Sequence, residues 1–185
     1  MQPKVNGLPQ LNDDELTTPQ HDRLCICLLN KETLAVYVKK DNKIQEGIKK
    51  IIEQFNKKGK TYEEWTEREY ESKYISHSVD FENPILEKVV KSNSGFIIGY
   101  IDVLVYINIK IKYEFILSNK TEIRETTKSF PIAIEVKTKI RSIGEVLRQL
   151  QTYKSTLGCH LVLVSNNPTN KEVFEGQGFS FWEVM

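Results

Sequence analysis

The spacing of hydrophobic residues predicts helices near the start of the chain. Between residues 42 and 57, isoleucine and phenylalanine recur every three or four positions, which indicates an amphipathic helix. Further upstream, Thr18 followed by Pro19 is typical of an N-cap and a first helical position. We therefore expect a helix that begins there and ends at about Leu29.

Three other segments of the first half have a weaker periodicity. Residues 61–75 predict a helix that is acidic on one face and carries aromatic residues, including Trp65, on the other. The short apolar run at residues 34–38 predicts a strand. Residues 81–91 are compatible with either a strand or a short helix that follows Pro84.

Apolar runs in the second half predict strands that alternate with helices. The strands are expected at residues 96–109, 113–117, 132–137, 160–165 and 179–184. Ser142 and Glu145 form a capping box, so a helix should begin there and run to about Leu157, before Gly158. A short helix is expected at residues 170–175. This order of elements predicts an α/β fold with a mixed, partly parallel sheet.

Composition places the chain among soluble globular proteins. Of its 185 residues, 39% are hydrophobic and 28% are charged, which is neither a disordered nor a fibrous composition. No apolar run approaches the roughly 18 residues of a membrane helix, and the first residues do not resemble a signal peptide. The three cysteines are too few for a disulfide framework, which favours a reducing compartment. We expect an intracellular, cytoplasmic protein with no membrane association.

The net charge of +1 hides a segregation of charge along the sequence. Residues 39–60 carry eight lysines against three acids, and residues 61–87 carry eight acids against two basic residues. Residues 135–160 are basic again, with five basic residues against two acids. Basic segments of this kind are typical of polyanion-binding surfaces, although the solvated faces of lysine-rich helices give the same pattern.

Asp102 is the first residue that calls for a chemical explanation. It lies within residues 99–107, where its neighbours are apolar or aromatic. A buried carboxylate is unfavourable unless it is paired, hydrogen-bonded or bound to a metal. Asp102 is therefore either a solvated or lysine-paired residue at a strand end, or a metal ligand.

The strand at residues 132–137 carries a second acid and a lysine. With a period of two, Glu135 and Lys137 share one face and lie about 7 Å apart, although an exposed strand edge would give the same pattern. Asp102, Glu135 and the backbone carbonyl of Val136 would hold a hard divalent cation, Mg²⁺ or Mn²⁺. Lys137 would orient or deprotonate a metal-polarised water, or stabilise charge that develops on a phosphate.

The helix that follows this strand adds two polar residues. Gln149 and Tyr153 are four positions apart and therefore share one flank of the helix, beside Arg148 and Lys154. A glutamine on the helix directly after the Glu-x-Lys strand can reach the same cleft. Without that context, Gln149 would be read as an ordinary surface residue of the helix.

Together these motifs resemble the PD-(D/E)XK nuclease superfamily, which includes restriction endonucleases, archaeal Holliday-junction resolvases and the nuclease domains of recombination helicases. The matching segments are Gly99-x-Ile-Asp102, Ile134-Glu135-Val-Lys137-Thr138 and Gln149-x-x-x-Tyr153. The resemblance covers roughly residues 81–184 and implies a restriction-endonuclease-like core of a helix, three strands, a helix and a strand. It also implies that Asp102, Glu135 and Lys137 bind metal and catalyse, with Gln149 and Tyr153 lining the cleft.

On this basis residues 1–185 form a single nuclease-like domain, in which an N-terminal helical and strand extension (1–80) precedes the core (81–185). The sequence departs from the family pattern in two places. Ile101 stands where many members have proline, and 33 positions separate Asp102 from Glu135. The second departure predicts an inserted hairpin or loop at about residues 108–129.

The family often has a further acid on the first core helix, and the sequence offers several candidates for it. They are Asp22, Glu71 and Glu82, of which Glu82 is favoured because it precedes the Asp102 strand at the entrance to apolar sequence. His77 is an alternative, since a histidine replaces the acid in some nucleases with the glutamine–tyrosine motif.

A zinc site is the weaker interpretation of another histidine. His21 stands four residues before Cys25, and Cys27 follows on the same expected helix. No second pair of ligands is nearby in the sequence, so a structural zinc site is disfavoured.

The favoured function is a metal-dependent endonuclease that hydrolyses DNA phosphodiester bonds by attack of a metal-activated water. The first alternative is an inactive module of the same fold that binds nucleic acid or serves in assembly. A second alternative is a structural domain whose acidic and basic segments pair between subunits. A homodimer is expected for the nuclease, because cutting both strands needs two sites.

Overall fold

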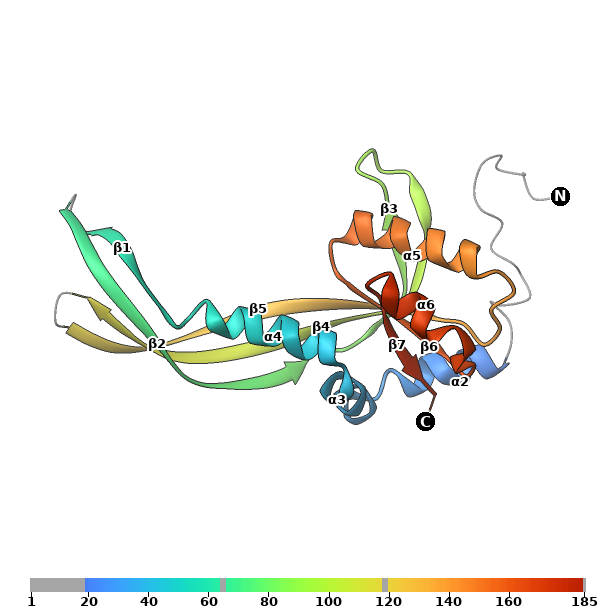
Figure 1. Ribbon diagram of the computed structural model, residues 1–185, viewed down its shortest axis with the longest axis horizontal. Helices are drawn as coiled ribbons and strands as arrows, with labels where there is room; N and C mark the ends of the chain where they lie inside the picture. Colours follow the sequence, from blue (N-terminus) through green and yellow to red (C-terminus); the bar gives the residue numbers. More distant parts are fainter. Residues whose placement is uncertain (1–18, 64–65, 118–119, 185) are drawn as a thin grey trace. The chain divides into compact units, whose positions relative to one another are not determined.

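The computed structural model describes residues 19–63, 66–117 and 120–184 (Figure 1). Its helices are α2 (Pro19–Cys27), α3 (Lys31–Lys40), α4 (Asn42–Glu53), α5 (Ile143–Leu157) and α6 (Lys171–Gly176), with a 3₁₀ turn, η1, at Pro168–Asn170. Its strands are β1 (Lys57–Glu63), β2 (Thr66–Phe81), β3 (Ile85–Lys91), β4 (Ile97–Leu117), β5 (Lys120–Val136), β6 (His160–Ser165) and β7 (Ser180–Glu183). The expected N-cap Thr18 and the aromatic residue Trp65 lie outside the described residues.

The described strands form one mixed sheet, in the order β1-β2-β4-β5-β6-β7, with β3 also paired to β4. The pairs β1–β2, β2–β4 and β3–β4 are antiparallel, whereas β5–β6 and β6–β7 are parallel. The prediction of an α/β fold with a mixed, partly parallel sheet is therefore confirmed. Within the part of the chain described here, no helix is long and apolar enough to cross a membrane.

The chain divides into two compact units, each built from separate stretches of sequence. The first unit contains residues 19–37, 83–105 and 131–184, and the second contains the described residues of 38–82 and 106–130. Strands β4 and β5 contribute residues to both units. Helix α2, which was expected in an N-terminal extension, thus belongs to the same unit as Asp102 and Glu135.

Parallel strands and helix α5 form the core of the first unit. The side chains of β5 and β6 are buried throughout Ile132–Val136 and Leu161–Ser165, as expected for central strands with both faces covered. The expected cap is confirmed, since Ser142 Oγ accepts a hydrogen bond from the Glu145 N–H at 3.4 Å. Gly158 ends α5 in the left-handed conformation, with φ of 59°, as its position after the last helical residue predicts.

The predicted strand at residues 34–38 is wrong, because this segment lies within α3. Leu34, Tyr37 and Val38 are buried at helical spacing, while Val36 between them is exposed. Asn30 stabilises the start of α3, since its side-chain oxygen accepts hydrogen bonds from two backbone N–H groups in the first turn. A run of five apolar residues fits a strand or a helix equally well, and the capping asparagine decides between them.

The predicted helix at residues 61–75 is also wrong, because β1 and β2 form an antiparallel pair there. Cross-strand ion pairs join Lys58 Nζ to Glu71 at 3.6 Å and Lys60 Nζ to Glu67 at 2.9 Å. In β2 the acids at odd positions alternate with other residues at even positions, which is the period of a strand. On a neighbouring strand, Phe115 stacks on Tyr70 with the ring centroids 5.4 Å apart.

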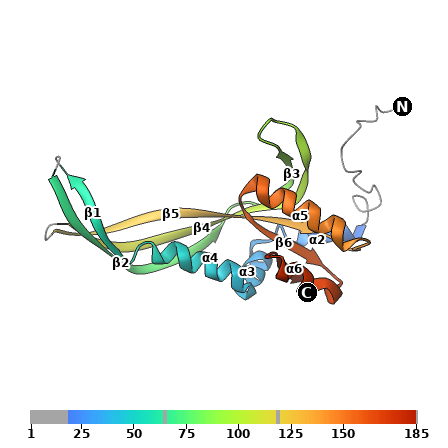
Figure 2. The ribbon, with the colours of Figure 1, turned by 45° about the horizontal axis from the view of Figure 1, so that its top comes forward.

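The second unit contains the expected insertion in the form of long strands. Strand β4 continues to Leu117 and β5 begins at Lys120, so most of the hairpin or loop expected at about residues 108–129 is strand. Figure 2 shows α4 alongside these strands, as predicted from its apolar stripe. Two isoleucines of that stripe, Ile44 and Ile48, are buried, and the side chain of Asp41 caps the helix.

Candidate functional site

Asp102 lies in the first unit, and its carboxylate contacts the neighbouring strand β5. Its Oδ2 accepts a hydrogen bond of 2.6 Å from the backbone N–H of Val136. The next N–H, that of Lys137, points to the other edge of β5 and donates to the carbonyl of Val164 on β6 at 2.9 Å. The Asp102 side chain thus takes the place that a β4 carbonyl occupies in a regular ladder, and this contact fixes the carboxylate.

Glu135 precedes Val136 on β5, and only 2% of its surface is exposed. One carboxylate oxygen, Oε1, lies 3.0 Å from Lys137 Nζ and accepts a hydrogen bond of 2.8 Å from Gln149 Nε2. The other oxygen, Oε2, is buried and has no hydrogen-bond partner among the described residues. Buried carboxylate oxygens are nearly always satisfied, so an orphaned one indicates a missing cation or donor.

The environment of Glu135 disfavours its charged form. Burial, and then the negative charge of Asp102, raise the pKa of Glu135 to about 8, although Lys137 and Gln149 oppose the shift. The Lys137 ammonium beside Glu135 offsets only part of the cost of burial and of the repulsion from Asp102. A divalent cation between the two acids would reverse this effect.

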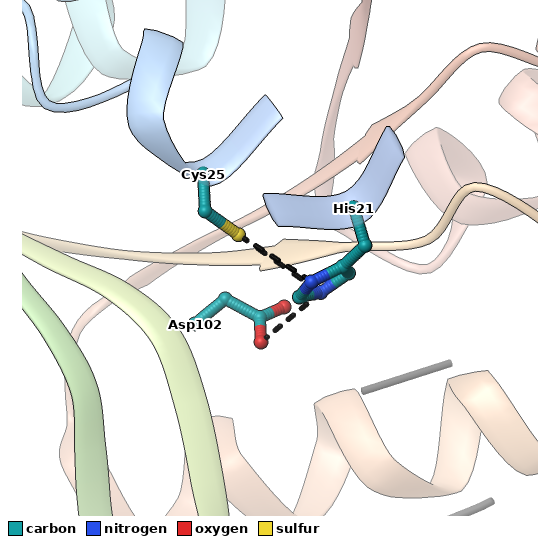
Figure 3. Close-up of side chains that lie close together, drawn as sticks. All are labelled: His21, Cys25 and Asp102. Atoms are coloured by element: carbon teal, nitrogen blue, oxygen red, sulfur yellow. Dashed lines mark hydrogen bonds and ion pairs between the residues drawn. The ribbon is translucent and has the colours of Figure 1, made fainter. Parts of the chain in front are cut away.

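Helix α2 brings His21 and Cys25 to the other side of Asp102 (Figure 3). The two side chains are one helical turn apart on the same face, and both residues are 8% exposed. His21 Nε2 lies 3.4 Å from Asp102 Oδ1, and Cys25 Sγ lies 3.8 Å from His21 Nδ1. One ligand atom from each of the three residues falls within 4.8 Å of the others, a spacing suited to a shared metal ion.

His21 is protonated in this arrangement. The hydrogen bond with Asp102, and then that with Cys25, raise the pKa of His21 to about 11 against the opposing effect of burial. The imidazolium therefore neutralises Asp102 in the metal-free protein. A metal ion at this position must displace the proton, because only a neutral imidazole nitrogen is a ligand.

Gln149 and Tyr153 connect helix α5 to both site strands. Gln149 Nε2 contacts the Tyr153 hydroxyl at 3.0 Å as well as Glu135, and that hydroxyl donates to the carbonyl of Tyr100 on β4 at 3.0 Å. The chain of hydrogen bonds from Tyr100 to Glu135 holds the buried carboxylate in one orientation. The structure thus brings together Asp102, Glu135, Lys137, Gln149 and Tyr153, all of which were selected from the sequence.

We expect Gly99→Ala to destabilise the protein, because a Cβ at Gly99 would overlap the hydroxyl of Tyr153. Overpacking of this kind costs about 1–3 kcal/mol. Urea unfolding measures the effect, with Gly144→Ala as the control, since that Cβ would meet only the tip of Arg148 at 3.8 Å. Tyr153→Phe, which removes the hydroxyl, should recover part of the loss in the double variant. Unchanged stability of Gly99→Ala would contradict the close packing of α5 on β4.

The structure places the other expected acids differently. Glu82 and Glu71 belong to the second unit, where Glu82 accepts a hydrogen bond from Asn108 at 3.0 Å and Glu71 pairs with Lys58. His77 is also in that unit and contacts the Tyr74 hydroxyl at 2.7 Å. The role given to Glu82 stays a prediction.

The residue that sequence reasoning missed is His21. It was considered only as a zinc ligand with Cys25 and Cys27, but Cys27 is exposed and the third partner is Asp102. The available signal was the four-residue spacing of His21 and Cys25, which places both on one face of the first helix. The exposed acid Asp22 lies 3.5 Å from His21 Nδ1 and borders this group.

His21, Cys25 and Asp102 form a group of side chains that could hold a metal ion. Glu135 is not part of that group, but it is a second buried acid in the same unit. The unpartnered oxygen of Glu135 gives a specific place for a cation. Comparisons with protein families, with curated proteins and with solved structures find no match to this chain.

Proposed function

We propose that this chain is a metal-dependent endonuclease with a restriction-endonuclease-like core of the PD-(D/E)XK type, and that it hydrolyses phosphodiester bonds in DNA. The order of elements supports the proposal, since β3, β4, β5, α5 and β6 follow one another as the resemblance implies. Helix α2 would be the helix before these strands, and it carries His21. The parts of β4 and β5 that belong to the second unit, within residues 106–130, would be an insertion between Asp102 and Glu135.

The single observation that carries the proposal is the buried, unpartnered Oε2 of Glu135. The carboxylate lies beside a second buried acid, Asp102, which raises its pKa. As a purely structural feature this arrangement is unfavourable, and an apolar residue would fill the place at no electrostatic cost. A bound divalent cation accounts for both acids at once.

His21, Asp102 and Glu135 would hold the cation, with the carbonyl of Val136 as the further ligand expected from the sequence. Carboxylate oxygens suit Mg²⁺ and Mn²⁺, and the imidazole favours Mn²⁺ over Mg²⁺. A bound ion of this class supplies a water of lowered pKa and stabilises negative charge on a phosphoryl oxygen. The thiol of Cys25, close to the His21 ring, would increase the affinity for zinc.

The side chains around the cation would stabilise charge and hold the ligands in place during hydrolysis. Water would attack phosphorus, forming a new P–O bond as one ester P–O bond breaks. The attacking water would give a proton to solvent and the leaving oxygen would take one up from solvent, so that the products are a phosphate monoester and a hydroxyl. The ammonium of Lys137 would stabilise the charge that develops on the phosphate. Gln149 would keep Glu135 oriented, and Tyr153 would keep Gln149 in place through its bond to β4.

Lys137→Ala is expected to abolish cleavage and to change DNA affinity only a few-fold. The reason is that one lysine is a small part of a footprint on many phosphates, whereas its charge at the reacting phosphate is unique. The cleavage rate and the affinity measured by fluorescence anisotropy, both with the same oligonucleotide, separate the effect on catalysis from the effect on DNA binding. Exposed Lys139 two residues later provides the control, and Lys139→Ala should retain cleavage. Undiminished cleavage by Lys137→Ala would remove this residue from the mechanism.

The proposed function is tested by incubating the protein with supercoiled, linear, branched and single-stranded DNA in Mg²⁺, Mn²⁺ or EDTA. We expect cleavage of at least one substrate in Mn²⁺ and none in EDTA. The inactive-module alternative predicts binding with no cleavage in either metal. A homodimer and a cytoplasmic location stay predictions, which sedimentation and cell fractionation would test.

A further inference from the structure

The hairpin of β3 and β4 in the first unit exposes an unusual amount of apolar surface. Phe96, which directly precedes β4, has 74% of its surface exposed, the largest fraction among the exposed large hydrophobic residues of the described chain. Ile85, Leu86, Ile97 and Tyr100 on the same two strands are each about 40% exposed. Figures 1 and 2 both show the turn of this hairpin extending beyond helix α5. Several exposed apolar side chains on one hairpin are typical of a binding surface.

The turn before Phe96 is well defined by hydrogen bonds. The Ser92 N–H donates to the Phe96 carbonyl at 2.8 Å, and the Phe96 N–H donates to Ser92 Oγ at 3.1 Å. The Gly95 N–H donates to the Ser92 carbonyl, and Gly95 has φ of +86°, a conformation that favours glycine. The turn therefore presents Phe96 in a fixed position at little entropic cost on binding.

The hairpin is attached directly to the candidate site. Strand β4 leads from Phe96 to Asp102 in six residues, or about 20 Å at 3.3 Å per residue. Between them, Gly99 and Tyr100 contact Tyr153 of α5, which also contacts Gln149. A nucleic acid strand with a phosphate at the site would have to extend over about 20 Å to reach Phe96.

Charge on β3 favours a nucleic acid over a second copy of the chain. Lys88 and Lys91 are both exposed on this strand and outnumber its one acid, Glu87, which is also exposed. Among the described strands β3 pairs only with β4, but its other edge is a poor template for a further strand. Glu87 in its middle has φ of +48°, and Glu87 and Lys88 place two charges at this kink. A kink and charged side chains on an edge strand disfavour edge-to-edge pairing.

We propose that the β3–β4 hairpin binds unpaired DNA, with Phe96 stacking on an exposed base and Lys88 and Lys91 contacting the neighbouring phosphates. The proposal rests on the proposed function for its choice of DNA, and it defines the substrate as one with single-stranded character. Stacking is the suitable interaction, because every base offers a face and a paired duplex offers none at its sides.

The test measures binding in EDTA, so that it does not depend on cleavage. Fluorescence anisotropy is recorded with a 20-nucleotide single strand and with the matching duplex, for wild type, Phe96→Ala, Phe96→Trp and Val173→Ala. Val173 on α6 is the matched control, because it is also apolar and exposed, at 45%. A single strand that contains 2-aminopurine reports stacking directly by the quenching of its fluorescence.

We expect wild type to bind the single strand more tightly than the duplex. Phe96→Ala should bind the single strand about 5- to 100-fold more weakly than wild type does, because it loses the stacking of one base. It should also fail to quench the fluorescence of 2-aminopurine. Duplex binding should be unchanged, Phe96→Trp should retain affinity, and Val173→Ala should behave as wild type. Equal affinity of wild type and Phe96→Ala for the single strand would overturn the proposal. So would a dimer in sedimentation that Phe96→Ala dissociates, since the hairpin would then bind a second copy. If the protein does not cleave DNA but its single-strand binding and the 2-aminopurine quenching depend on Phe96, only the proposed nuclease function is rejected and the proposed binding site is kept.

Discussion

Glu135→Gln is expected to abolish metal-dependent cleavage and to leave the protein folded. Glutamine has the same shape, and its amide oxygen can still accept hydrogen bonds from Lys137 and Gln149, which Oε1 accepts in the native protein. It cannot supply the negative charge that a cation needs at the position of Oε2. The cleavage rate should fall by at least about 10²-fold, the effect of removing one preorganised electrostatic contact. Asp102→Asn should have a similar effect.

Glu172→Gln is the control for this experiment, because Glu172 is an exposed acid on α6 in the same unit. It should cleave and bind Mn²⁺ as wild type does. Isothermal titration calorimetry should show weaker Mn²⁺ binding for Glu135→Gln than for wild type. In thermal unfolding, the transition temperature of Glu135→Gln should be at least as high as that of wild type. Wild-type cleavage by both Glu135→Gln and Asp102→Asn would show that the active centre lies elsewhere.

The metal-free protein is expected to lose stability as the pH rises, on the order of a few kcal/mol between pH 5 and 9. The pKa of Glu135 is raised from 4.5 to about 8, so between these values the unfolded chain releases a proton that the folded chain keeps. The pKa of His21 is raised from 6.5 to about 11, so its stabilising effect is complete below pH 6.5 and is lost as the pH rises toward 11. In both windows the folded state binds more protons, and the free energy of unfolding therefore falls.

Urea unfolding in EDTA at a series of pH values measures this slope. Glu135→Gln should flatten it between pH 4.5 and 8, and His21→Gln should flatten it above pH 6.5, whereas Glu172→Gln should leave it unchanged. Excess Mn²⁺ should stabilise wild type more at pH 8 than at pH 6, because the metal competes with these protons. A wild-type slope equal to that of Glu135→Gln between pH 5 and 8 would show that the carboxylate is already ionised without metal.

The sequence predicted the elements whose signals are local and unambiguous. Helix α5 is defined by the cap at Ser142 and the left-handed Gly158, and β6 by a continuous apolar run. The errors at α3 and β2 occurred where the pattern allows two periods. Residues 34–38 and 61–75 fit either element by composition, and the partners that decide lie elsewhere, such as Asn30 for α3 and Lys58 for β2.

For the site, the sequence supplied the residues carried by strands and by α5, because their spacing is short and their neighbours are apolar. His21 could not be linked to Asp102 in this way, since 81 positions separate them and their contact depends on how α2 packs. Nor could the sequence show that Asp102 accepts a hydrogen bond from the Val136 N–H, or that one oxygen of Glu135 has no hydrogen-bond partner among the described residues. That oxygen is the feature on which the metal assignment depends.

A crystal of the protein grown with Mn²⁺ and measured at the manganese absorption edge would test the central claim most directly. The account predicts one anomalous peak in the first unit, bonded to Oε2 of Glu135, to an Asp102 carboxylate oxygen and to His21 Nε2, at about 2.0–2.3 Å from each ligand. Asp102→Asn crystals treated in the same way should lack it. A map with no peak beside Glu135 at saturating Mn²⁺, with the His21–Asp102 pair intact, would contradict the account.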